Sequence, residues 1–477
     1  MKLYNTLTRK VDDFTPLEDG KVKLYTCGLT VYSQPHIGNW VAYIYWDILV
    51  RTLRASGYDV ERVQNITDVG HLTDDGDAGE DKMQKGALRE GKTAWDVAAK
   101  YINIADHEAF EQLGLLIPEH MPRATDYIQQ QIDFVKELEQ KGFVYKIADG
   151  VYFDTSKLDD YGKLARLDIE GLEFGARVAD TGKKTPTDFA VWKFSPADQK
   201  RDMEWDSPWG KGFPGWHLEC SVMARELLGD TIDIHTGGID HIPVHHTNEI
   251  AQTESVTGKK FANFWLHANR MKVDGTKMSK SLGNIYTLDD ITKKGYSVMA
   301  FKMLVLSKHY RTEGNFTWDI LEASANRLKR WQSIAVLRHQ TNDTLENDDD
   351  KDTNHDINGQ ILAAPHASLE ALQNDLSSPE AIAKLERLFD VIEKSSLAKL
   401  QQSALTELFS WIDDTLGLQL MIASPDISDD AKRLLLQRKN ARESKDWAAA
   451  DQLRQQLTTR GITVRDTAHD QIWEYSR

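Results

Sequence analysis

The feature that most constrains the fold is a strand, loop and helix pattern within residues 23–57. A β-type run ends at Thr26 and leads into a short loop, after which a long helix with an apolar stripe begins near His36. Gly57 is placed to end that helix before a second β run at residues 58–67. This order predicts one βαβ unit, with a ligand site at the carboxyl ends of its strands. His36 stands where the helix N-terminus offers unpaired N–H groups suited to phosphate.

Length and composition favour a globular protein of several domains. The chain has 477 residues, which is enough for about three domains with sizeable cores. No apolar run is long enough to span a bilayer, and the N-terminus lacks the apolar segment of a signal peptide, so we expect a cytoplasmic protein with no membrane partner. The net charge of −16 argues against a general nucleic-acid coat. A specific RNA needs only a local basic surface, so it stays compatible with this charge.

Two short motifs carry the strongest functional signal. The first is His-Ile-Gly-Asn at residues 36–39, and the second is Lys-Met-Ser-Lys-Ser at residues 277–281. Together and in this order they resemble the two signatures of class I aminoacyl-tRNA synthetases. Residues 27–28, 214–220 and 245–249 narrow the resemblance to the cysteinyl-tRNA synthetases, and the likeness extends over almost the whole chain.

Two positions depart from the first signature. The second histidine of the usual motif is Asn39 here, and the arginine that usually follows two residues later is Val41. Some of the contacts that bind the ATP triphosphate must therefore come from other groups.

The resemblance implies an α/β fold. It consists of a split Rossmann-like catalytic domain with an inserted connective domain, an α-helical bundle and a small C-terminal anticodon-binding domain. The boundaries that we expect are 1–290 for the catalytic domain, about 115–210 for its insertion, 291–340 for a helical stem-contact region, 341–424 for the bundle and 425–477 for the anticodon-binding domain.

Two acidic segments interrupt this organisation. Residues 341–359 are rich in Asp and Asn and are predicted to form a solvated connector. Residues 68–81 have an Asp spacing that suggests calcium, but they lack the closing Glu and the flanking helices of an EF-hand. A solvated loop near the active site is the better prediction for them.

The resemblance implies a cysteine ligase. Such an enzyme activates L-cysteine with ATP to cysteinyl-adenylate and transfers the cysteine to tRNA(Cys), releasing AMP and pyrophosphate. Attack of a carboxylate on the α-phosphate needs positioning and positive charge more than covalent help, and Mg²⁺ accompanies the ATP. The expected catalytic residues are His36, Asn39, Lys277 and Lys280. The expected ATP-binding residues are His36, Gly38, Gly237, Gly238, Asp240 and Lys280.

A second group of residues suggests a metal site. Its members are Cys27, Cys220, His245 and Glu249. The last two are four apart on a predicted helix and share one face, and the cysteines supply thiolates from the two halves of the split fold. From the residues alone, buried structural cysteines and an ordinary helix histidine are the favoured interpretation.

The resemblance implies instead that these four residues bind one Zn²⁺ ion per chain. His241 and His246 are alternative ligands that do not match the family position. A metal that takes the substrate thiolate directly would reject serine without an editing site. The residues expected to bind cysteine are Gly28, Thr67, Trp216 and His235.

The C-terminal segment bears on the choice among related functions. The alternatives are a ligase that joins cysteine to an amino-sugar, as in mycothiol biosynthesis, and a catalytically inactive tRNA-binding paralogue. The first ends without an anticodon-binding piece, whereas residues 442–473 resemble one. The intact lysine signature and metal candidates argue against the second. We expect a monomer that contacts RNA phosphates through Arg438, Arg442 and Lys445 and stacks bases near Trp447 or Trp473.

Overall fold

The structure, a computed structural model, describes residues 1–70, 81–167, 182–196, 201–341, 355–467 and 471–476. The chain divides into two compact units. The first unit comprises Met1–Ile291 and Tyr310–Phe316, and the second unit comprises Thr292–His309 and Thr317–Arg477. Within the described ranges, no helix is long and apolar enough to cross a membrane.

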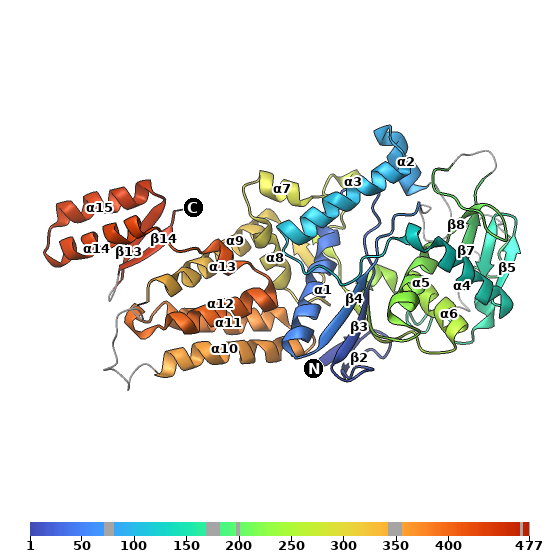
Figure 1. Cartoon of the computed structure of the whole chain (residues 1–477), viewed down its shortest axis with the longest axis horizontal. Coiled ribbons are helices and arrows are strands. Elements are labelled where there is room, and N and C mark those ends of the chain that lie inside the picture. The colour runs from blue at the N-terminus through green and yellow to red at the C-terminus, as the bar shows by residue number, and fades with distance from the viewer. Residues whose placement is uncertain (71–80, 168–181, 197–200, 342–354, 468–470, 477) are drawn as a thin grey trace. The chain divides into compact units, whose positions relative to one another are not determined.

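A four-stranded parallel sheet lies at the centre of the first unit (Figure 1). In spatial order its strands are β10 (Ala262–Ala268), β9 (Ile232–Gly238), β3 (Lys21–Thr26) and β4 (Asp59–Gln64). The pairs β3–β4 and β9–β10 come from distant parts of the sequence and join where β3 pairs with β9. Both faces of the sheet are covered, so β3 buries Val22, Leu24 and Tyr25 in succession along its length.

Helix α1 (Ile37–Ala55) connects β3 to β4 and packs against strands of this sheet. Asn39 caps its first turn, because the Asn39 Oδ1 accepts a hydrogen bond from the backbone N–H of His36 at 3.0 Å. Gly57 follows the helix with a φ of +90°, a conformation that favours glycine. The predicted βαβ unit is therefore confirmed.

The glycine pair Gly237–Gly238 lies at the end of a strand, because β9 continues through Gly238. A Cβ atom on Gly237 would collide with the rings of His241 and His246. Close packing of imidazoles, rather than a tight turn, requires glycine at position 237.

The remaining elements of the first unit surround this sheet. Its helices are α2 (Lys82–Glu90), α3 (Ala94–Asp106) with a π-helical turn at His107–Gln112, a 3₁₀ turn at Ala124–Tyr127, α4 (Ile128–Gln140), a 3₁₀ turn at Thr155–Lys157, α5 (Trp216–Leu228), a 3₁₀ turn at Ile239–His241, α6 (His245–Thr257), a 3₁₀ turn at Lys280–Leu282 and the start of α7 (Leu288–Lys293). Two small sheets pair β1 (Lys2–Asn5) with β2 (Lys10–Asp13) and β11 (Met271–Val273) with β12 (Gly314–Phe316).

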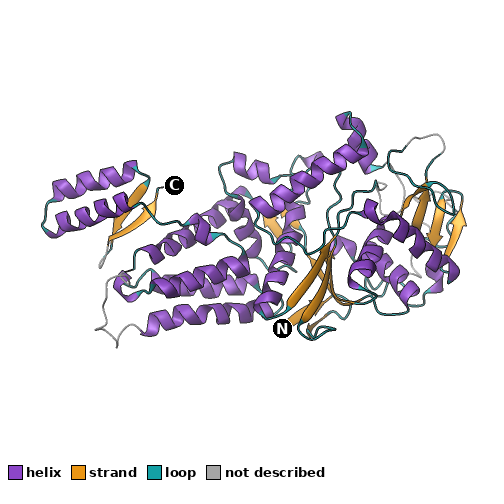
Figure 2. Cartoon of the chain, viewed as in Figure 1, coloured by secondary structure: helices purple, strands orange, loops and turns teal. Residues whose placement is uncertain are grey.

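A four-stranded antiparallel sheet separates the two halves of the parallel sheet in the sequence. Its strands are β5 (Val144–Ile147), β6 (Gly150–Phe153), β7 (Phe189–Phe194) and β8 (Gly212–Pro214), in that spatial order. Figure 2 shows the parallel and antiparallel sheets as separate groups of strands. The strand β8 leads directly into α5, which returns the chain to the parallel sheet.

The second unit is almost wholly helical. Its elements are α8 (Val298–Leu306), α9 (Trp318–Val336), a 3₁₀ turn at Leu337–His339, α10 (His355–Gln373), α11 (Ser378–Ile392), a 3₁₀ turn at Leu397–Lys399, α12 (Gln402–Leu416), α13 (Leu420–Ala423), α14 (Asp429–Glu443), α15 (Trp447–Thr459), β13 (Ile462–Asp466) and β14 (Gln471–Tyr475). The two strands form an antiparallel hairpin beside the α14–α15 pair. Most of the acidic connector predicted at 341–359, and most of the acidic loop predicted at 68–81, lie outside the described residues.

Candidate active site and metal centre

A pocket of about 340 Å³ opens at the carboxyl ends of β3 and β9, beside the start of α1. This is the edge of a parallel sheet where ligands usually bind. Nine of the predicted site residues line it: Cys27, Gly28, His36, Gly38, Asn39, Trp216, Gly237, Gly238 and Asp240. The carboxylate of Asp240 forms an ion pair with Arg270 across the rim.

The two signature segments lie against each other at this pocket. A Cβ atom on Gly38 would collide with the terminal methyl of Met278, so glycine at this position leaves room for the second segment. The backbone N–H of Ile37 also donates to the carbonyl of Tyr286 at 2.8 Å. Segments about 240 residues apart in the sequence therefore meet at one helix N-terminus.

The loop with the second signature is organised by Asn284. Its Oδ1 accepts from the N–H of Ser279 at 2.8 Å, and its Nδ2 donates to the carbonyl of Lys277 at 3.2 Å. The side chain of Lys277 is exposed, and the side chain of Lys280 lies outside the described part of the chain. Sequence reasoning overlooked Asn284, although an Asn after Gly283 is a common loop-closing residue.

Behind the pocket, the four predicted metal ligands form a buried cluster. One ligand atom from each of Cys27, Cys220, His245 and Glu249 lies within 4.8 Å of every other. Thiolates, an imidazole and a carboxylate are ligands that Zn²⁺ prefers, so the donor set fits this ion in its chemistry. Helix α6 places His245 and Glu249 on one face as predicted, with the His245 Nε2 2.7 Å from the Glu249 Oε1.

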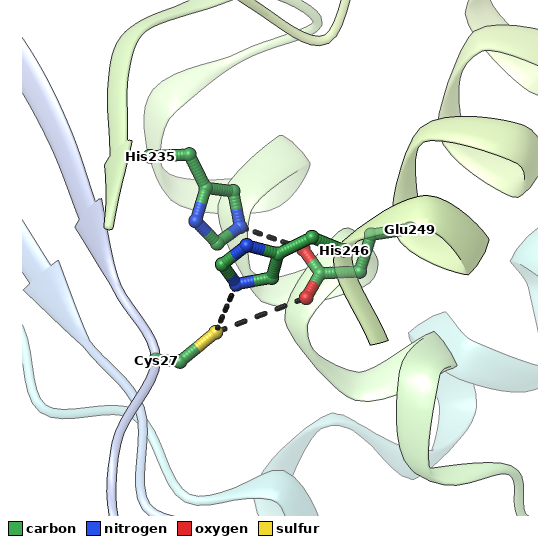
Figure 3. A group of neighbouring side chains, drawn as sticks. All are labelled: Cys27, His235, His246 and Glu249. Carbon is green, nitrogen blue, oxygen red and sulfur yellow. Dashed lines mark hydrogen bonds and ion pairs between the residues drawn. The ribbon is translucent and has the colours of Figure 1, made fainter. Parts of the chain in front are cut away.

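A second set of ligand atoms overlaps the first (Figure 3). It keeps Cys27 and Glu249 and replaces the other two residues by His235 and His246. The Cys27 Sγ lies 3.3 Å from the His246 Nε2, and the His235 Nε2 lies 2.6 Å from the Glu249 Oε2. The two oxygens of Glu249 thus face different partners.

A hydrogen-bonded chain extends from His246 away from the pocket. The His246 Nδ1 is 2.8 Å from the His267 Nε2, and the His267 Nδ1 is 2.7 Å from the Thr6 Oγ1. Because Nδ1 of His246 already has this partner, its Nε2 is the nitrogen turned toward Cys27. Sequence reasoning missed His267, since a lone histidine in a strand gives no signal.

Charge is distributed unevenly over the cluster. Burial by itself lowers the pKa of His245, but the Glu249 carboxylate and Cys220 outweigh burial and raise this pKa to about 10. Contact with Cys27 lowers the pKa of the Cys220 thiol, whereas burial raises that of Cys27. Burial holds the pKa of His246 well below its usual range, so its imidazole is neutral. The lowered pKa values of Cys220 and Glu249 favour their anionic forms, which supply the charge that a dication requires.

Two of the predicted cysteine-binding residues, Gly28 and Thr67, are tied together by Asn65. Its Oδ1 accepts from the backbone N–H of Gly28 at 2.8 Å, and its Nδ2 donates to the Thr67 Oγ1 at 3.0 Å. Thr67 is buried next to Gly28, and the Trp216 ring lies 4.6 Å from that of His245. The side of the pocket formed by Gly28 and Trp216 therefore adjoins the metal cluster.

Comparison with known proteins agrees with this geometry. Residues 13–326 match the family described as tRNA synthetases class I (C) catalytic domain, and residues 424–473 match the cysteinyl-tRNA ligase anticodon binding domain. The chain is 45% identical to cysteine–tRNA ligase 1 of Burkholderia lata over 99% of this chain and 96% of that protein. It is 38% identical to the cysteine–tRNA ligase of Treponema denticola over 99% of both.

The chain belongs to the cysteinyl-tRNA synthetase family. Its fold is also that of a more distant class I synthetase. The Mycobacterium tuberculosis methionyl-tRNA synthetase in complex with methionyl-adenylate superposes with a TM-score of 0.56 at 15% identity, over 90% of this chain and 96% of that one. The expected fold class is thus confirmed.

The anticodon-binding domain of this family member corrects two of our expectations. Arg438 is 2% exposed and forms two hydrogen bonds to the Asp466 carboxylate, so it does not present a charge to RNA. Trp473 is 4% exposed and packs in the core of the domain. Trp447 is 56% exposed, and the guanidinium of Arg442 lies over its ring at 5.6 Å. Of the two tryptophans, Trp447 is the one available for stacking.

Proposed function

We propose that this chain activates L-cysteine with ATP to cysteinyl-adenylate and transfers the cysteine to tRNA(Cys). The observation that carries the proposal is the adjoining position of two features. The buried donor set around Cys27 and Glu249 lies directly behind the pocket where the two signature segments meet. A thiol-binding centre beside a triphosphate site suits the activation of cysteine.

Adenylate formation rests on the helix start. The substrate carboxylate attacks the α-phosphorus, and the bond to the bridging oxygen of pyrophosphate breaks. His36 and the N–H groups of the first turn of α1 would donate to phosphate oxygens, and Lys277 and Lys280 would bring positive charge from the signature loop. Asn39 holds its Oδ1 on the backbone of His36, so its Nδ2 is the group that would reach the phosphate. Mg²⁺ would enter with the ATP.

The adenosine would lie along the end of β9. Gly237 and Gly238 allow the nucleotide to approach the backbone, and Asp240 would accept a hydrogen bond from the ribose. The Asp240–Arg270 ion pair would have to share or release this carboxylate when ATP binds.

Selection of cysteine is assigned to the buried cluster. One Zn²⁺ ion would be held by Cys27, Cys220, His245 and Glu249. When bound, this ion supplies a Lewis acid that suits the thiolate of cysteine and does not suit the hydroxyl of serine. Trp216 closes the small pocket beside His245, and Gly28 and Thr67 would contact the amino acid. His235 would hold the Glu249 carboxylate in place from behind.

Recognition of tRNA is assigned to the end of the chain. We propose that residues 425–477 bind the anticodon and that 291–340 contact the tRNA stem, with the chain acting as a monomer. The matched family at 424–473 supports the first assignment.

The test measures cysteine-dependent exchange of pyrophosphate into ATP, with serine as the control substrate, followed by charging of tRNA(Cys). We expect exchange with cysteine only, and charging of tRNA. Exchange without charging, together with product formation on an amino-sugar acceptor, would favour the amino-sugar ligase. A different cysteine–tRNA ligase that charges the same tRNA(Cys) serves as the positive control. If that control works while this chain shows no exchange, the inactive paralogue is favoured.

A further inference from the structure

The loop before the first signature is held by a buried carboxylate that sequence reasoning did not single out. Glu108 is 2% exposed and belongs to the π-helical turn at His107–Gln112. Its Oε1 accepts from the Gln34 Nε2 at 3.0 Å, and its Oε2 accepts from the indole N–H of Trp40 at 2.7 Å. These two donors lie on either side of His36 in the sequence.

Glu108 is an unusual residue to bury at this point. Among the described residues it forms no ion pair, so both of its oxygens rely on neutral donors. A buried carboxylate without a countercharge costs stability, and burial accordingly raises its pKa. Such a residue is a candidate for a role at a nearby site rather than in the packing of the core.

The π-helical turn explains how Glu108 reaches the loop. The backbone N–H of Leu113 donates to the carbonyl of Glu108, five residues back, at 2.9 Å. The wider turn changes the direction of the side chain relative to a regular continuation of α3, as such insertions often do near functional sites.

Gln34 extends the contact to the second signature. Its Nε2 also lies 3.3 Å from the Oδ2 of Asp289, which follows the Lys277–Ser281 segment. Only the amide NH₂ group can serve two carboxylates at once, so the orientation of Gln34 is fixed by both. Gln34 itself lines the pocket.

We propose that Glu108 is a positioning residue for adenylate formation, acting through Gln34 and Trp40 on the placement of His36. It holds the loop and the first turn of α1 in one geometry and, through Gln34, couples them to the segment after the second signature. This inference rests on the proposed function, because His36 is given its role there.

The chemistry of an amide at position 108 makes the test specific. In Glu108→Gln, one oxygen can still accept from Trp40, but the NH₂ group then faces the NH₂ group of Gln34. If Gln34 turned over, its oxygen would face Asp289. If instead the new amide turned over, its NH₂ group would face the indole N–H of Trp40. In every arrangement at least one contact of Gln34 or Trp40 is lost while the volume of the side chain is kept.

The experiment compares Glu108→Gln with Glu111→Gln, an exposed position on the same turn that pairs with His107. We expect Glu108→Gln to lower the kcat of cysteine-dependent pyrophosphate exchange about tenfold, the scale of a small misplacement of a catalytic group. The KM for cysteine, the zinc content and the single-turnover transfer from preformed cysteinyl-adenylate to tRNA should stay unchanged. Glu111→Gln should match the wild type in every assay.

A second variant guards against a folding defect. Gln34→Met removes the contact between Gln34 and Glu108 by changing its partly exposed partner. The double variant Gln34→Met/Glu108→Gln should exchange pyrophosphate no more slowly than the slower single variant, because both substitutions break the same interaction. Wild-type exchange by Glu108→Gln, or equal slowing of activation and transfer, would overturn the proposal.

Amide hydrogen exchange separates this inference from the proposed function. If the wild type shows no cysteine-dependent exchange of pyrophosphate, the proposed function fails, and the positioning role is then judged on residues 33–40 alone. Faster amide exchange there in Glu108→Gln than in Glu111→Gln would support it, and equal rates would overturn it.

Discussion

Single residues decide where a metal ion would sit in the buried cluster. Cys27 and Glu249 belong to both overlapping donor sets, whereas Cys220 belongs only to the first and His246 only to the second. The first set contains two sulfurs, and the pKa of one of them, Cys220, is lowered, whereas the second set contains one sulfur and the neutral imidazole of His246. Zinc prefers thiolate-rich sites, which favours the first set.

Substitution of the two distinguishing residues should therefore give opposite results. We expect Cys220→Ser to lose most of its zinc and most of its affinity for cysteine, because one of two thiolates is gone. His246→Asn, the matched control, should keep about one zinc per chain. Metal analysis of the purified variants decides the matter, and the reverse pattern would assign the ion to the second set.

Asp68 gives a residue-scale prediction for stability. Burial raises the pKa of this carboxyl to about 6, although Thr125 donates to it from its hydroxyl at 2.7 Å and its backbone N–H at 3.0 Å. Between about pH 4 and pH 6 this carboxyl is ionised in the unfolded chain but still protonated in the folded protein. The contribution of Asp68 to stability therefore falls as pH rises through this range.

Asp68→Asn should remove this loss, since an amide can keep both contacts to Thr125 without a charge. We expect the variant to gain up to about 3 kcal/mol over the wild type at neutral pH and little near pH 4. Urea unfolding at several pH values measures the difference. Asp126→Asn, an exposed neighbour, serves as the control, and an equal pH slope for Asp68→Asn and wild type would contradict the prediction.

At the scale of elements, α1 and the second signature loop are fitted to each other through Gly38. Alanine suits a helix interior better than glycine, so Gly38→Ala should not destabilise α1 by itself. Its methyl group would instead displace Met278 and crowd the ring of His36. We expect pyrophosphate exchange to fall about 10- to 100-fold with unchanged thermal stability.

Met278→Ala should relieve this crowding. The double variant Gly38→Ala/Met278→Ala is expected to recover most of the activity that Gly38→Ala loses, relative to Met278→Ala alone. Simple additivity of the two effects would show that the contact between the segments has no part in activation.

In the α14–α15 pair and its hairpin, one tryptophan is exposed and the other is buried, a difference that the sequence could not show. Trp447→Ala should weaken tRNA charging by about 1–3 kcal/mol in kcat/KM, the scale of one stacked base, and leave unfolding unchanged. Trp473→Ala should destabilise the domain by about 3–5 kcal/mol, because its ring fills the core. Thermal unfolding and charging assays on both variants measure this, and a stable Trp473→Ala with lost charging would reverse the assignment.

At the scale of the whole molecule, activation and tRNA recognition should be separable. The pocket and the metal cluster lie in the first unit, whereas residues 424–473 match an anticodon binding domain. Truncation after Ser424 should leave pyrophosphate exchange and zinc content largely intact. It should sharply lower tRNA charging, more so at higher salt, because the remaining contacts are mainly electrostatic. Equal charging by the full and truncated chains would remove the anticodon role.

The sequence by itself determined the local elements and the family. Apolar periodicity gave the βαβ unit, since the pattern of side chains along one strand or helix is a property of neighbouring residues. Spacing put His245 and Glu249 on one helix face, and the two signatures identified the synthetase class before any contact was known.

Only the tertiary structure decided which side chains meet across the chain. Asn65, His267 and Glu108 carry no motif, and their partners lie at positions that no local pattern relates to them. Trp447 and Trp473 are alike in the sequence, but packing buries one and exposes the other. Burial, charge and donor geometry depend on contacts between distant segments, and those contacts exist only once the chain has folded.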